Sequence, residues 1–104
     1  MLWSFKPMSS ARQSDSAIRE EILRATPLGS TEEEVDRYAK SRFEQDNFFH
    51  WAKRENDGPI LMCLYGCYTE VRHFPFATCV RVSWRFSKDH LLTEVSVGRW
   101  VDSF

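Results

Sequence analysis

The C-terminal half of the chain alternates between apolar and polar residues, and this period of two constrains the fold more than any other feature. Between positions 76 and 86 one alternating set is Phe76, Thr78, Val80, Val82, Trp84 and Phe86. The other set is Cys79, Arg81, Ser83 and Arg85. Successive side chains of a strand point to opposite faces of a sheet. The pattern therefore predicts a strand with one face on the core.

Two neighbouring segments also predict strands. Residues 60–71 are almost continuously apolar or aromatic, as in a strand partly covered on both faces, and Gly66 indicates a bulge or a close neighbour. Residues 91–101 alternate again. With a four-residue hairpin loop at 87–90, the expected cross-strand pairs are Phe86 with Leu91, Trp84 with Thr93, Val82 with Val95 and Val80 with Val97. A shift of one residue in the strand pairing would expose all of these apolar side chains to solvent, so we expect a strongly constrained register.

The N-terminal half has the period of helices instead. Ile18, Ile22 and Ala25 predict a helix from about Ser16, which ends before Pro27. A capping box, from Thr31 with Glu34 or Ser30 with Glu33, opens a second helix. Its apolar stripe is Val35, Tyr38, Ala39 and Phe43. Residues 44–59 predict a connection, with a short strand or a turn of helix at 48–53.

These elements predict an α+β fold, with two N-terminal helices packed on one face of a three- to four-stranded antiparallel meander sheet. The 104 residues suffice for one hydrophobic core, so we expect a single domain over 1–104 with 1–15 as a flexible lead-in.

Composition argues against several classes of partner. The formal charge of -1 gives no reason to expect nucleic acid. No stretch approaches the roughly 20 apolar residues of a membrane span. Residues 1–12 lack the apolar core of a signal peptide, which predicts a cytoplasmic protein, or a periplasmic one if a leader has been removed. Three cysteines, Cys63, Cys67 and Cys79, form no even framework, so we expect free thiols in a reducing compartment.

The residue types that carry chemistry form no constellation in the sequence. His50, His73 and His90 fall in separate connections or turns, without metal-ligand spacing to one another. The acidic run Glu32, Glu33 and Glu34 suits the first turn of a helix, where it favours the helix dipole. We therefore expect no catalytic residue, no metal and no cofactor, and a protein that is not an enzyme.

The second face of the sheet is the best candidate for function. Arg81, Arg85, Glu94 and Trp100 should project there, and arginine and tryptophan are enriched at binding hot spots. The chain also holds more large aromatics than this core needs: Trp3, Phe5, Trp51, Trp100 and Phe104. Both observations predict a protein partner, such as a toxin or an enzyme.

The segment Thr26–Thr31, followed by Glu34 and Val35, resembles the helix-opening motif of many small bacterial α+β proteins in which a helical pair precedes an antiparallel sheet. The layout is also similar to that of β-lactamase inhibitor protein repeats and of small lipoproteins of outer-membrane assembly, and immunity proteins are often of this size. The resemblance implies protein binding through the sheet, of the immunity or inhibitor type.

Two alternatives stay open. The first is a small-ligand-binding or enzymatic domain, with a pocket between helices and sheet lined by Tyr38, Tyr65, Cys67 and Tyr68. The second is a relative of small envelope lipoproteins, which would need a leader and a lipidated cysteine upstream of Met1.

Overall fold

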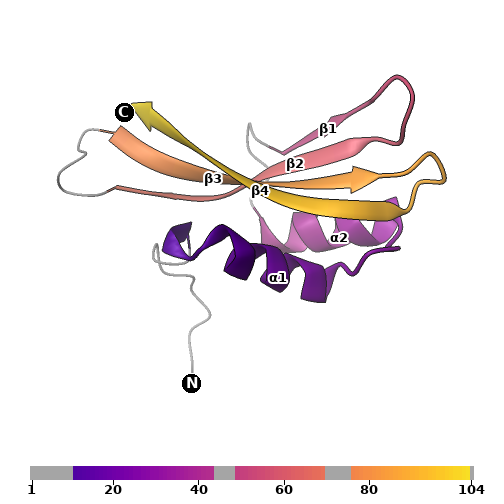
Figure 1. Ribbon diagram of the computed structural model, residues 1–104, viewed down its shortest axis with the longest axis horizontal. Coiled ribbons are helices and arrows are strands. Elements are labelled where there is room, and N and C mark those ends of the chain that lie inside the picture. The colour runs from indigo at the N-terminus through magenta and orange to yellow at the C-terminus, as the bar shows by residue number, and fades with distance from the viewer. Residues whose placement is uncertain (1–10, 44–48, 70–75, 104) are drawn as a thin grey trace.

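A computed structural model describes residues 11–43, 49–69 and 76–103, and it shows the predicted α+β architecture (Figure 1). Two helices, α1 (Asp15–Ala25) and α2 (Glu32–Arg42), come first. Four strands follow: β1 (His50–Ala52), β2 (Ile60–Tyr68), β3 (Phe76–Phe86) and β4 (Leu92–Ser103). They form one antiparallel sheet in the order β1-β2-β3-β4, which confirms the meander.

Local capping residues decide where both helices begin. The Ser14 side chain accepts a hydrogen bond from the Ala17 N–H at 3.1 Å, so α1 starts at Asp15, one residue before the predicted start. Of the two possible capping boxes, the structure contains the one at Thr31. The Thr31 N–H donates to Glu34 Oε1 at 2.9 Å, and the Glu34 N–H donates to Thr31 Oγ1 at 3.2 Å. The predicted lead-in is described only from residue 11 onward, and Ala11 is buried there.

The core lies between the helices and one face of the sheet. Ile18 and Ile22 of α1 and Val35 and Ala39 of α2 are fully buried against it. The predicted core positions of β3 from Val80 to Phe86 are also fully buried. Four predicted core positions are wrong. Ala25 is exposed because α1 turns it outward, and Phe76 is 47% exposed at the end of β3. Leu91 and Thr93, expected opposite Phe86 and Trp84 in the core, are also exposed.

The hairpin between β3 and β4 has a different register from the predicted one. Trp84 pairs with Val95, two residues beyond Thr93, and Phe86 pairs with Leu92. Leu91 forms a bridge with Thr31 instead of joining β4, and the Leu92 N–H donates to the Ser30 carbonyl at 2.8 Å. The loop is therefore longer than expected. Thr93 is the extra residue of a bulge between the Arg85 and Phe86 pairs.

A second irregularity confirms the bulge expected near Gly66. The pairing of β2 with β3 shifts between Leu64 and Gly66, which leaves Tyr65 as the extra residue. This shift brings Cys67 directly opposite Cys79.

The helices cover only one face of the sheet, and none of the described elements lies over the other face (Figure 1). We call this uncovered side the open face. Among the described residues, no helix is long and apolar enough to cross a membrane.

Candidate functional site

The open face carries all four residues predicted to bind a partner, and they occupy three of four successive rows across the strands. Arg85 lies between Ile60 of β2 and Glu94 of β4. Two rows further along, Arg81 lies between Leu64 and Gly98. Trp100 follows beside Cys79. Alternation along the strands was enough to place these side chains on one face. The observed hairpin differs from the predicted register by two residues, and a shift of two residues does not change the face on which a side chain lies.

Arg81 and Trp100 form the first pair on this face. The guanidinium carbon of Arg81 lies 5.9 Å from the centre of the Trp100 ring, within the range of a cation–π contact. Gly98 makes this possible, because the guanidinium lies directly over its backbone. A Cβ atom at Gly98 would come within 3.3 Å of the Arg81 Nη2 atom. The sequence shows this glycine in a strand, but not that an arginine would lie over it.

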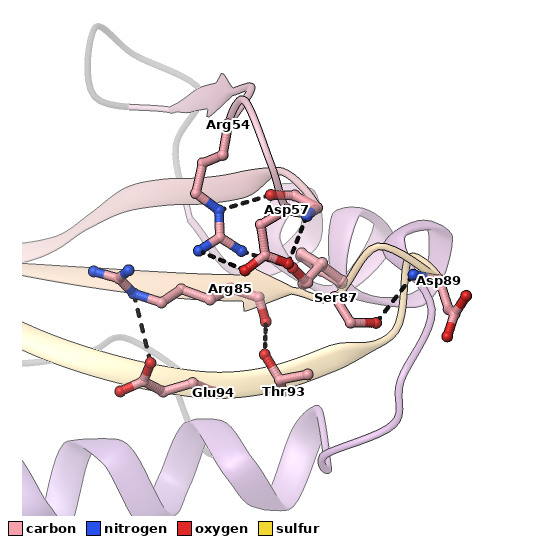
Figure 2. A network of polar contacts seen from close by, with 9 residues as sticks. Arg54, Asp57, Arg85, Ser87, Asp89, Thr93 and Glu94 are labelled. Atoms are coloured by element: carbon pink, nitrogen blue, oxygen red, sulfur yellow. Dashed lines mark hydrogen bonds and ion pairs between the residues drawn. The ribbon is translucent and has the colours of Figure 1, made fainter.

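Arg85 and Glu94 form the second pair, on neighbouring strands (Figure 2). Arg85 Nε lies 3.6 Å from Glu94 Oε1, which is an ion pair but longer than a hydrogen bond. Both side chains are substantially exposed, so the pair contributes little to stability. Its charges remain accessible to a partner.

An apolar row along β2 borders these charges, and the sequence-based prediction missed it. Met62 pairs with Ser83, and Ile60, Met62 and Leu64 all lie on the open face with half-buried side chains. The apolar run 60–71 was expected of a strand covered on both faces, but the described elements cover only one of them. The run itself was the signal that could have identified the row.

Cys67 and Cys79 are joined by a disulfide across β2 and β3, so the expectation of free thiols is wrong for these two residues. Spacing along the sequence could not show this pairing, because it depends on the bulge at Tyr65. Cys63 is a buried residue opposite Val82, on the face toward the helices. The disulfide lies on the open face, in the same row as Trp100.

We predict that a Cys67→Ala, Cys79→Ala double variant loses about 3 kcal/mol of unfolding free energy, because the disulfide closes a short loop and restricts the unfolded chain. Urea unfolding of both proteins, with and without dithiothreitol, measures the effect. The reductant should destabilise the wild type and leave the double variant unchanged. Equal stability of the two proteins without reductant would contradict the prediction.

Of the four residues predicted to line a pocket between helices and sheet, Tyr38, Tyr65 and Tyr68 pack against the core on the helix side, and Cys67 does not. Tyr65 lies under the helices and is 8% exposed, and its hydroxyl donates to Glu21 Oε1 at 2.8 Å. Tyr38 packs edge-on against Phe43, with the ring centres 6.2 Å apart. Cys67 is on the opposite face of the sheet, in the disulfide, so the predicted set cannot line one pocket.

The environment of Tyr65 makes stability depend on pH at the alkaline end. Burial first, and then the hydrogen bond to the Glu21 carboxylate, raise the pKa of Tyr65 from 10.0 to about 12. Between these values the unfolded chain releases the proton while the folded chain keeps it. The contribution of Tyr65 to the unfolding free energy is therefore fully present below about pH 10 and is lost as the pH rises toward about 12.

We expect a Tyr65→Phe variant to lose less stability than the wild type between about pH 10 and pH 12. The difference in unfolding free energy between the two proteins, measured in urea at several pH values, isolates this residue from lysines and other tyrosines. The prediction fails if that difference is constant across the window.

A groove of about 640 Å³ lies at one end of the molecule, away from the predicted pocket. Ala52 and the loop of residues 53–59 line it together with Glu32, Trp51, Lys88 and His90. Its volume is within the range of small-molecule sites. Some of its charges are already paired, since His90 Nδ1 contacts Glu32 Oε2.

Arg54 holds the loop at this groove against the end of β3. Its Nε donates to the Gly58 carbonyl and its Nη2 donates to the Phe86 carbonyl, both at 2.7 Å (Figure 2). Its Nη1 also lies 3.5 Å from Asp57 Oδ2. Arg54 therefore has a structural role here and offers little of its charge to a ligand.

The histidines and acidic residues form no metal site within the described ranges. No three His, Cys, Asp or Glu side chains there are grouped so that they would hold a metal ion. His50 is the first residue of β1 rather than part of a connection, and His73 lies outside the described residues. Of the surplus aromatics, Trp51 and Trp100 are half-buried, whereas Trp3, Phe5 and Phe104 lie outside the described residues.

Comparisons with protein families, with curated proteins and with solved structures found no match for this chain. The case for a function therefore depends on the geometry of the chain itself.

Proposed function

We propose that this chain is a non-enzymatic protein-binding module, of the immunity or inhibitor type, that binds its partner on the open face of the sheet. The observation that carries the proposal is the apolar row of Ile60, Met62 and Leu64 on a face that no described element covers (Figure 1). The solvated face of an antiparallel sheet normally carries polar side chains. An apolar row at this position is typical of an interaction surface.

The neighbouring charges indicate the chemistry of the partner. Arg81 forms no ion pair with a carboxylate among the described residues, and Arg85 shares its charge only with the exposed Glu94. Trp100 stands beside Arg81 as a large, half-buried ring. We therefore expect a protein partner with an apolar patch bordered by carboxylates, on a toxin or an enzyme.

The disulfide adds to this proposal in two ways. It joins β2 and β3 within the face, which limits the flexibility that a partner would have to restrict on binding. It also favours an oxidising compartment over the cytoplasm, because disulfides seldom persist among cytosolic proteins.

The test compares two charge reversals. An Arg81→Glu, Trp100→Ala variant changes the open face, whereas Arg37→Glu changes an exposed arginine on α2. A candidate partner is captured on the immobilised wild type, purified, and titrated calorimetrically against all three chains. We expect the open-face variant to bind at least about 100-fold more weakly and the Arg37 variant to bind within about threefold of the wild type.

Circular dichroism and urea unfolding of both variants should first show an intact fold, since Arg81 and Arg37 are exposed and Trp100 is half-buried outside the core. We also expect the wild-type affinity to fall with added salt, because exposed arginines contribute to it. An open-face variant that binds as tightly as the wild type would rule out this face as the binding site.

A further inference from the structure

The outer edge of β4, the side that faces away from β3, is protected at its start. The Leu92 N–H donates to the Ser30 carbonyl and the Leu92 carbonyl accepts from the Gly29 N–H, both at 2.8 Å. Further along, Arg19 Nε of α1 donates to the Val95 carbonyl, also at 2.8 Å. These bonds show that the backbone groups of Leu92 and Val95 point away from β3.

The second half of the same edge is open. Because backbone groups alternate in direction along a strand, those of Val97, Arg99 and Val101 also point away from β3. They have no hydrogen-bond partner within the part of the chain that the structure describes. We call the stretch Val97–Val101 the free edge.

Sheets usually protect such an edge. The other edge strand, β1, is protected by its length of only three residues, whereas β4 has twelve. Charged side chains, above all lysine, as well as proline and a bulge, are the common devices that keep a long edge from pairing. The bulge of β4 is at Thr93, before the free edge, and the free edge has no lysine or proline. Its one charged side chain, Arg99, is bonded to Asp15 and to the Ala11 carbonyl. Its last side chain, Val101, is 65% exposed.

We infer that the free edge pairs with the free edge of a second copy of this chain, antiparallel, about a two-fold axis at Arg99. The outward backbone groups of Val97, Arg99 and Val101 would then form reciprocal hydrogen bonds between the two copies. This inference concerns a different surface from the open face and does not depend on the proposed function.

The residues along the free edge favour a second copy as the occupant. In this register each Val97 lies opposite a Val101, which makes two apolar cross-strand pairs. Each Gly98 lies opposite a Trp100, and an aromatic ring opposite a glycine stabilises a strand pair.

The charges at the two-fold axis do not oppose the pairing. Arg99 Nε donates to Asp15 Oδ1 at 2.6 Å, and Arg99 Nη1 donates to the Ala11 carbonyl at 2.8 Å. The two guanidinium groups are therefore each held beneath their own sheet with a carboxylate of their own.

Sedimentation equilibrium of the wild type tests the inference. The contact is small, so we expect a reversible dimer with a dissociation constant on the order of 10 to 100 μM. The apparent mass should rise from the 12.3 kDa of one chain at low micromolar concentration toward twice that value at millimolar concentration. A mass that stays at one chain throughout would overturn the inference.

Val101→Pro and Val101→Thr form a matched pair of variants. Proline removes an N–H that points to the outside and leaves the bonds to β3 in place, whereas threonine keeps both the N–H and the shape. We expect Val101→Pro to weaken the dimer at least about tenfold and Val101→Thr to change it less than about threefold. A Val101→Pro variant that dimerises like the wild type would also overturn the inference.

Amide hydrogen exchange of the wild type gives a second measurement that does not depend on any variant folding. Exchange at Val97, Arg99 and Val101 should slow as the concentration rises. Exchange at Ser96, Gly98 and Trp100, whose N–H groups point toward β3, should stay constant. Equal behaviour of the two sets would contradict pairing at this edge.

Discussion

Replacing Gly58 with alanine is expected to lower the free energy of unfolding by about 3 to 5 kcal/mol. A Cβ atom at this position would lie 2.0 Å from the Ser87 carbonyl oxygen and 2.5 Å from the Phe86 carbonyl oxygen. Both are backbone atoms at the end of β3, so neither can rotate away. The loop of residues 53–59 would have to move off the strand.

That movement would also break the hydrogen bonds that close the loop. Arg54, labelled in Figure 2, donates to the carbonyls of Gly58 and Phe86. The Phe86 N–H donates to the Pro59 carbonyl at 3.1 Å. Each such bond contributes about 0.5 to 1.5 kcal/mol. Overpacking and lost hydrogen bonds together account for the size of the expected effect.

Gly66→Ala is the matched control, because it adds the same methyl group to another glycine of the sheet region. A Cβ atom there would meet only the Ala11 Cβ at 3.4 Å, an ordinary contact. We expect a change of less than about 1 kcal/mol. Urea unfolding of the three proteins measures both effects, and equal stability of the two variants would refute the role of the close approach at Gly58.

Replacing Trp84 with alanine is expected to cost about 3 to 5 kcal/mol of stability. Trp84 is 0% exposed and is the largest of the fully buried side chains. Its Nε1 donates to Thr26 Oγ1 at 3.1 Å, and that hydroxyl donates to the Ile22 carbonyl at 2.8 Å. The alanine variant would lose the ring contacts, leave a cavity, and remove the link between β3 and the end of α1.

Trp51→Ala provides the comparison for the same change at a less buried ring. Trp51 is half-buried, with its Nε1 bonded to Asp36 Oδ1 at 2.9 Å and its ring 5.6 Å from that of Phe86. We expect a loss of about 1 to 2 kcal/mol, because water already reaches part of this ring. Thermal and urea unfolding should rank the two variants in this order, and the reverse order would show that Trp84 is not the centre of the core.

The elements of this fold could be predicted because their signals are local. The stop at Pro27 and the capping box at Thr31 act on neighbouring residues of the chain, and the structure contains both helices. The alternation along 76–86 likewise placed Val80, Val82, Trp84 and Phe86 in the core. Each signal depends on a few residues in a row, so the surrounding structure changes it little.

The register of the last hairpin could not be predicted, because a distant contact sets it. The backbone at Gly29 and Ser30 bonds to Leu92, about sixty residues later in the chain. This bond holds Leu91 out of β4 and places a bulge at Thr93. Turn length alone indicated a shorter loop.

For the candidate site, alternation along the strands determined that Arg81, Arg85, Glu94 and Trp100 share one face, because a strand turns every second side chain the same way. Only the tertiary structure decided what surrounds them: the disulfide of Cys67 with Cys79, brought together by the bulge at Tyr65, and the arginine that lies over Gly98. It also decided which face the helices leave open (Figure 1) and which half of the β4 edge is protected by hydrogen bonds. The reason is physical: the direction of a side chain follows from its own strand, whereas its neighbours depend on registers and packing that span the whole chain.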